Sequence, residues 1–473
     1  MGFLVGALCI ILFSVFLVQI GKARELASTV YNDKSEEYAI NTFQAGFGMV
    51  FMIVFLLGCI ASFVYYMPYI LGWGPYTAAS EHGPVVDRLF NVTLLITAIV
   101  FFITQFALFY FAWKYRGRKG SKGIYWAHNE KLEMVWMIVP SVVMTFLVIG
   151  GLQAWNQIMI DLPDDHKSVV LPSSENEHIE IEATGTQFLW ILRYPGRDGK
   201  LGIRDFTKID GGTNPLGQVW SDPNNIDDFH PDKIVLPVGK KVRVRITARD
   251  VLHNFYIRDF RVKMDAVPGM PTYFIFTPTV TTDSMRRRLK ERPEWQVADK
   301  NDPNKQRWET FDYELACAEL CGRGHYSMRR IVKIVSDEEY LAWIDAQEGG
   351  SLSAEGQVEG VKTQYFANIK GTAADVLASS EEMKNYEGIM AAKVKANAKI
   401  EAAAKDVSIM AQVQVPLKAL RLATTAADAE KAFSEIDRIT AGYSTVETPV
   451  MDTTAVADTT AVEIDTTAAP TPH

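Results

Sequence analysis

The sequence predicts a membrane protein of the α+β class: N-terminal transmembrane helices, a β-sandwich, and then a helical and finally disordered C-terminal extension. Long apolar runs are confined to the first third of the 473 residues. Short alternating runs follow as far as about residue 335, and an Ala-, Lys- and Glu-rich stretch comes after them. The net charge of −8 argues against a nucleic-acid partner, because nucleic-acid binding is driven by basic surfaces.

Four apolar stretches are each long enough to span a bilayer, which requires roughly 20 helical residues. They cover about Gly2–Ile20, Gly46–Ile70, Leu89–Trp113 and Met134–Trp155. The loop between the last two is rich in Lys and Arg, which favours the cytoplasmic side. The fourth helix then leads outward, so we expect the domain after it on the outer, periplasmic face of a bacterial inner membrane.

The first stretch allows two interpretations. No basic side chain precedes it, whereas Lys22 and Arg24 follow it, the reverse of the charge order in a secretory signal. We therefore favour a retained helix over a cleaved signal.

Short alternating runs bounded by turns, from about Ile160 to Val335, predict the sandwich. The predicted strands are His178–Ala183, Phe188–Tyr194, Ile234–Pro237, Val242–Thr247, Tyr273–Phe276 and Ile331–Val335. Two longer loops interrupt this pattern, at Pro195–Pro231 and at Pro278–Thr310.

Soft metal ligands are concentrated in one run of the sandwich region. Cys317, Cys321, His325 and Met328 lie within twelve residues, and His253 follows an earlier strand-like run. Thiolate and thioether ligands select Cu(I), and imidazole also suits copper. A zinc site would not need the methionine. The alternative is a disulfide between Cys317 and Cys321, which explains neither histidine nor Met328.

These residues resemble the binuclear copper (CuA) site of cytochrome c oxidase subunit II. That family's pattern, C-x-E-x-C-x3-H-x2-M with an upstream D-V-x-H, is filled at every position here. The resemblance implies a cupredoxin-like sandwich in which both cysteine sulfurs bridge two coppers. It also implies that the carbonyl of Glu319 is a copper ligand and that its carboxylate helps to hold Mg²⁺ at the boundary with subunit I. The implied copper ligands are His253, Cys317, Glu319, Cys321, His325 and Met328.

A second motif of the same family, N-x-x-L-E-x-x-W-x-x-x-P, runs from Asn129 to Pro140. Its resemblance implies that Glu133 stands at the cytoplasmic entrance of a proton pathway into subunit I. The alternative is a solvated carboxylate that the helix dipole favours at a helix start. Family members usually have two helices, so the first two here are a departure, and we expect them to pack against other oxidase subunits.

The aromatic motif through which electrons enter, Q-W-x-W in the family, reads Gln187-Phe188-Leu189-Trp190 here. The resemblance assigns electron entrance to Phe188 and Trp190, although both also suit the core of a strand. Phe188 replaces the family's tryptophan, so we do not expect docking of an ordinary soluble cytochrome c. With the long loops, this suggests a c-type cytochrome donor that belongs to a neighbouring respiratory complex.

The sequence after the copper motif shows no pattern for a covalently bound haem. No cysteine follows Cys321, so the C-x-x-C-H motif needed for covalent haem is missing. The last thirty residues repeat Asp-Thr-Thr-Ala without Lys or Arg, which is typical of disorder. The predicted divisions are two additional helices (1–75), a helical hairpin (76–158), the copper domain (159–345), a helical extension (346–443) and a disordered tail (444–473).

The resemblance implies subunit II of a haem-copper terminal oxidase, which passes electrons to haem in subunit I, where oxygen is reduced to water with proton translocation. Two alternative functions would require a different metal site. A quinol-oxidising relative lacks the copper ligands, whereas here all are present. A copper chaperone would hold one exposed Cu(I) instead of a copper pair.

Overall fold

The computed structural model describes residues 2–30, 34–70, 72–118, 120–211, 214–219, 222–225, 227–347 and 381–443. They form two compact units, the first holding the described residues up to Met383 and the second beginning at Lys384. Each unit is described by itself.

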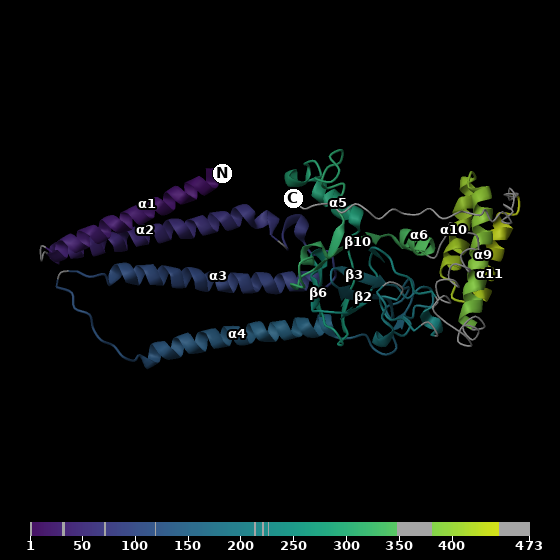
Figure 1. Ribbon diagram of the computed structural model, residues 1–473, viewed down its shortest axis with the longest axis horizontal. Coiled ribbons are helices and arrows are strands. Elements are labelled where there is room, and N and C mark those ends of the chain that lie inside the picture. Colours follow the sequence, from purple (N-terminus) through teal and green to yellow (C-terminus); the bar gives the residue numbers. More distant parts are fainter. Residues whose placement is uncertain are drawn as a thin grey trace, which may run out of the picture. The chain divides into compact units, whose positions relative to one another are not determined.

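The first unit opens with long helices (Figure 1): α1 (Gly2–Val30), α2 (Lys34–Tyr66), α3 (Gly83–Lys114) and α4 (Glu130–Met159). Among the residues described in full, three stretches are long and apolar enough to cross a membrane: Asn41–Tyr69, Gly83–Lys114 and Glu130–Met159. They confirm three of the predicted spans. The remaining predicted span, Gly2–Ile20, is helical, but the side chains of residues 2–11 lie outside the description, so its crossing of the membrane stays a prediction.

Two five-stranded sheets form the β-sandwich that follows. In one, the order is β1-β2-β5-β8 with β3 also on β2; in the other it is β4-β10-β9-β6-β7. The strands of the first sheet are β1 (Lys167–Ser168), β2 (Glu177–Thr186), β3 (Leu189–Arg193), β5 (Val242–Ala248) and β8 (Thr272–Phe276). The strands of the second are β4 (Ile234–Pro237), β6 (His253–Ile257), β7 (Val262–Ala266), β9 (Tyr313–Cys317) and β10 (Arg329–Val335).

Alternation along each strand builds the sandwich core. On β5, Val242, Val244 and Ile246 are fully buried, whereas Arg243 and Arg245 point away from the core, as expected from the two-residue period of a strand. All six predicted strands are confirmed with small shifts at their ends. The predicted fold class, transmembrane helices followed by a sandwich, is therefore correct.

The described parts of the two long loops are structured. Asp228 in the first loop bonds the buried Arg193 guanidinium at the end of β3 at 2.9 Å, and Glu182 on β2 bonds the same guanidinium at 2.8 Å. The second contains helix α5 (Thr282–Lys290), which buries Met285 and Leu289 and carries its basic residues on the other side. Helix α6 (Asp337–Gln347) follows the last strand of the sandwich.

Direct contacts join the helices to the sandwich. Arg261, in the turn before β7, forms an ion pair with Asp87 on the first turns of α3, at 2.6 Å. The Tyr273 hydroxyl on β8 donates to the Met159 carbonyl at the end of α4, at 3.1 Å. The start of α3 and the end of α4 are therefore both attached to the sandwich.

The second unit contains α9 (Glu381–Ala403) from Lys384 onward, together with α10 (Val407–Arg421) and α11 (Ala426–Ile439). Apolar side chains from all three, among them Ala392, Val413 and Ile436, form its core. The predicted helical extension is thus seen over residues 381–443. Residues 348–380 and the predicted disordered tail, 444–473, lie outside the description.

Candidate metal centre

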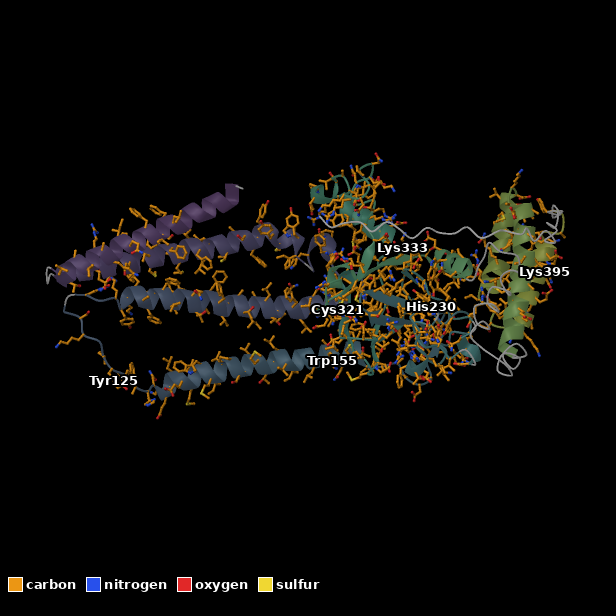
Figure 2. All side chains as sticks on the ribbon, viewed as in Figure 1. Tyr125, Trp155, His230, Cys321, Lys333 and Lys395 are labelled. Atoms are coloured by element: carbon orange, nitrogen blue, oxygen red, sulfur yellow. The ribbon has the colours of Figure 1, made fainter. Side chains whose placement is uncertain are left out.

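The ends of two neighbouring strands bring the predicted ligands together. His253 begins β6 and Cys317 ends β9, and these strands pair antiparallel with Phe255 opposite Cys317. The loop after Cys317 returns at Met328, whose carbonyl accepts from the Cys317 N–H at 3.2 Å. Residues distant in sequence therefore converge because the sheet register aligns them. Figure 2 labels Cys321 in this loop.

The donor atoms converge on one small volume. Nδ1 of His253 and the two cysteine sulfurs all lie within 4.8 Å of one another. His325 Nδ1 is 3.6 Å from Cys321 Sγ, and Met328 Sδ is 3.9 Å from the same sulfur. The Cys317 thiol donates to the Glu319 carbonyl at 3.1 Å. All six residues implied by the resemblance thus lie at one place.

The two sulfurs are 3.9 Å apart and both cysteines are free, whereas a disulfide would hold them at about 2.05 Å. The alternative of a Cys317–Cys321 disulfide therefore does not describe this structure. Two thiols, two imidazoles and a thioether are a soft donor set, which fits copper better than the oxygen-preferring cations.

Burial differs across the centre. His253 and Met328 are fully buried, and Cys317 and Cys321 nearly so, whereas the loop residues between the thiols and beyond them are more exposed. Burial raises the pKa of the Cys321 thiol to about 11, and the charge of Cys317 adds to this effect.

Asp250 fixes the orientation of His253. Its Oδ1 accepts from Nε2 of the imidazole at 2.8 Å, which leaves Nδ1 facing the Cys317 sulfur. Burial alone would raise the Asp250 pKa, but hydrogen bonds from the Gln187 N–H, from His253 and from the Val251 N–H lower it to about 2. A carboxylate that holds the second nitrogen of a histidine is a common support for metal ligands.

The segment before β3 packs directly on the ligand loop. Phe188 is half-buried against Gly322 and Gly324, where a Cβ on either glycine would collide with its ring. Trp190 is fully buried, and its ring lies edge-on to His253 with centroids 6.1 Å apart. Of the two residues predicted for electron entrance, Phe188 is therefore partly accessible, whereas Trp190 belongs to the core.

Glu133 lies in the first turn of α4. The Asn129 side chain accepts from the Leu132 N–H at 3.1 Å, and Glu133 accepts from the Asn129 N–H at 3.2 Å. This reciprocal pair is similar to a capping box, with the glutamate one position later than usual, and it satisfies N–H groups that the helix leaves unpaired. Helix capping thus accounts for one oxygen of Glu133, and its predicted proton role stays a proposal.

The sequence motifs contained Asp250 and Gln187 but did not reveal how they support the site. An aspartate three residues before a ligand histidine is a usable signal for such support. Gln187 carries no comparable signal, because only the fold brings it beside Cys321.

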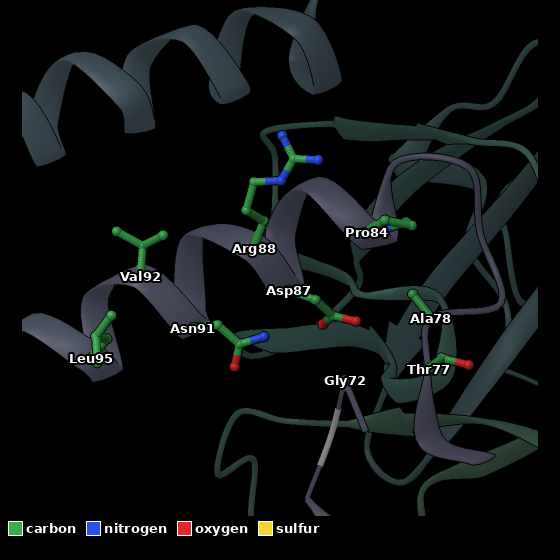
Figure 3. Close-up of a pocket in the computed structure, with 9 residues that line it drawn as sticks. All are labelled: Gly72, Thr77, Ala78, Pro84, Asp87, Arg88, Asn91, Val92 and Leu95. Atoms are coloured by element: carbon green, nitrogen blue, oxygen red, sulfur yellow. The ribbon is translucent and has the colours of Figure 1, made fainter. Parts of the chain in front are cut away.

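A hollow of about 480 Å³ lies elsewhere, where the α2–α3 connection meets α3 (Figure 3). Asp87 and Asn91 line it, and Arg88 leaves the helix on a different side (Figure 3). None of its lining residues is a candidate copper ligand.

Comparison with known proteins gives a consistent result. Residues 68–153 match the family described as "Cytochrome C oxidase subunit II, transmembrane domain", and residues 179–281 match "Cytochrome C oxidase subunit II, periplasmic domain". The alternative cytochrome c oxidase subunit 2 of Bradyrhizobium diazoefficiens is 32% identical over 302 residues, which cover 63% of this chain and 92% of that protein.

Cytochrome c oxidase subunit 2 of Thermostichus vulcanus is 25% identical over 315 residues, covering 64% of this chain and 86% of that protein. Among solved structures, the periplasmic domain of subunit II of cytochrome oxidase from Bradyrhizobium japonicum is 23% identical. The match covers 38% of this chain and 99% of that structure, with a TM-score of 0.23.

Proposed function

Since the chain belongs to the cytochrome c oxidase subunit II family, we propose that it accepts electrons from a c-type cytochrome on behalf of a haem-copper terminal oxidase. The electrons pass to haem in subunit I, where oxygen is reduced to water with proton translocation. The observation that carries this proposal is the convergence of two thiols, two imidazoles, a thioether and a carbonyl on one volume.

These donors are the ones that would hold a binuclear copper centre: Cys317 and Cys321 as the shared sulfurs, with His253, His325, Met328 and the Glu319 carbonyl completing it. When bound, such a centre supplies a redox site that gains and loses one electron with little change in bond lengths. The chain contributes a rigid support. His253 and Met328 are fully buried. The pairing of β6 with β9 fixes the separation between His253 and Cys317.

The proposed partners follow from the exposed parts of the ligand loop. Leu320 and Tyr326 are 81% and 78% exposed, although both lie next to ligands. Large apolar side chains at a functional loop suit a protein–protein interface. We assign this loop to contact with the oxidase assembly, and Phe188, packed over the loop, to the side from which the donor approaches.

Two further roles are proposed for carboxylates. The exposed Glu319 carboxylate would share Mg²⁺ with subunit I, since Mg²⁺ prefers oxygen ligands. Glu133 would admit protons from the cytoplasmic side. Replacement of Glu133 by Gln retains an oxygen for the cap but removes the charge. Fewer protons translocated per electron would support the proton role, and an unchanged ratio would leave Glu133 as a cap alone.

The location follows from the same premise. The three apolar helices make this an integral membrane protein, and we propose the bacterial inner membrane with the sandwich on the periplasmic face. We also propose that the donor cytochrome belongs to a neighbouring respiratory complex.

Purification of the chain from its native membrane in mild detergent tests the function. We expect a co-purifying haem protein and oxygen consumption driven by a reduced c-type cytochrome. Isolation of the chain without any haem protein, or an oxidase driven by quinol alone, would contradict the proposal. Rapid oxidation of soluble cytochrome c with other complexes removed would contradict the fixed donor.

A further inference from the structure

Gln187 joins the two sides of the candidate metal centre. Its side-chain Nε2 donates to the Cys321 carbonyl at 2.6 Å, and its backbone N–H donates to Asp250 Oδ2 at 2.7 Å. The other oxygen of Asp250 accepts from His253 at 2.8 Å. A continuous run of hydrogen bonds therefore connects the ligand on β6 with the ligand in the loop after β9. We propose that Gln187 is a positioning residue that fixes Cys321 for metal binding.

Cys321 itself is not held by a strand of either sheet. Cys321 lies between β9 and the short helix His325–Ser327, outside both sheets, so the sheet ladders do not hold it. It is followed by Gly322, whose φ of +134° lies in a region that side chains other than glycine rarely adopt. The Gln187 amide holds the Cys321 carbonyl, directly before Gly322.

The fit around the amide is close. A Cβ on Gly322 would come within 3.0 Å of Gln187 Nε2, and the neighbouring Phe188 ring occupies the rest of that face of the loop. The amide and the ring therefore reach the loop because both glycines lack side chains. Gln187 supplies the directional contact and Phe188 the packing.

The two hydrogen bonds of Gln187 can be separated experimentally. Its contact with Asp250 uses the backbone N–H, which every residue except proline retains. A side-chain substitution therefore breaks the link to Cys321 and leaves the support of His253 in place. Cys321 is the ligand whose position should change.

This inference rests on the proposed function, since it concerns the geometry of a copper centre. The full chain in detergent, loaded with copper, is compared with Gln187→Leu and Gln187→Glu. Leu removes all polarity, whereas Glu keeps the size and the polar surface but provides no donor when ionised. The matched control is Gln296→Leu, which removes an amide-to-carbonyl bond of 2.8 Å to Lys290, away from the candidate ligands.

Both Gln187 variants should lose copper to a chelator about tenfold faster than the unsubstituted chain, because loss of a contact that supports a metal ligand weakens metal affinity about 10- to 100-fold. Their copper hyperfine pattern in electron spin resonance should also change, whereas Gln296→Leu leaves both readouts unchanged. Unchanged copper loss and an unchanged hyperfine pattern in either folded Gln187 variant would overturn the inference. Failure of the unsubstituted chain to bind copper would instead refute the proposed function.

Discussion

Asp250 and His253 are joined by a hydrogen bond of 2.8 Å from the imidazole Nε2 to the carboxylate. This contact decides which ring nitrogen is free to bind metal, because the other one, Nδ1, then faces Cys317. Orientation of a ligand histidine by a carboxylate is therefore built into the fold before any metal arrives.

The first prediction concerns this contact. Asp250→Asn should weaken copper binding about 10- to 100-fold, since it removes the charge that fixes the imidazole. Competition with a chelator measures the change. Asp265→Asn is the control, because Asp265 accepts a hydrogen bond from Asn254 on the same strand as His253. Equal copper affinity in the Asp250 variant and the control would contradict the role of Asp250.

The second prediction concerns Phe188 and Gly324. A methyl group at Gly324 would collide with the Phe188 ring, although the Gly324 φ of −89° suits any residue. Gly324→Ala should therefore cost about 1–3 kcal/mol through overpacking alone. Its thermal unfolding midpoint and copper content should both fall.

The double variant Phe188→Ala, Gly324→Ala should recover part of the copper content, because the collision is removed. Gly211→Ala is the control, since no atom of the described residues lies within 4 Å of the added methyl group. If the double variant binds no more copper than Gly324→Ala, contact with Phe188 is not the cause.

The third prediction concerns the attachment of the helices. The Arg261 side chain is 6% exposed and bonds Asp87 at 2.6 Å. Asp87→Asn leaves a buried guanidinium without its counter-charge, which should cost about 3–5 kcal/mol. The exposed pair Asp283–Arg286 provides the control, and Asp283→Asn should cost at most about 1 kcal/mol. Equal shifts of the thermal midpoint in both variants would argue against a structural role for the buried pair.

The fourth prediction concerns pH and the second unit. Hydrogen bonds from Tyr443 and Ser408 lower the Asp406 pKa from 3.8 to about 2. The carboxylate caps α10, and a group with a lowered pKa stabilises the folded state above its unfolded pKa. That contribution should be lost as the pH falls from about 4 to about 2.

Faster amide hydrogen exchange in the first turn of α10 at the lower pH, beyond the intrinsic change in exchange rate, would show the loss. Asp406→Asn should abolish this pH dependence, since an amide does not titrate in that range. The same pH dependence in both proteins would exclude Asp406 as its origin.

The sequence allowed the fold class and the ligand set to be predicted because both depend on local patterns. Apolar length identified the helices, and six strands followed from alternation. The strands β1, β6, β7 and β9 were not among the predicted strands; β1 has only two residues, too few to show alternation. The burial of Trp190 and the reach of Gln187 to Cys321 depend on strand pairing across more than a hundred residues, which spacing alone does not reveal.

The ion pairs of Arg193 show the same limit. Its partners Glu182 and Asp228 lie on β2 and in the first long loop, so their burial depends on how that loop folds back. By composition alone, these carboxylates resemble a solvated surface.

Copper content together with electron spin resonance of the purified full chain tests the central claim most directly. We expect two copper ions per chain and a hyperfine pattern from one unpaired electron shared equally by both. A single copper ion, or a Cys317–Cys321 disulfide in the active oxidase, would contradict it.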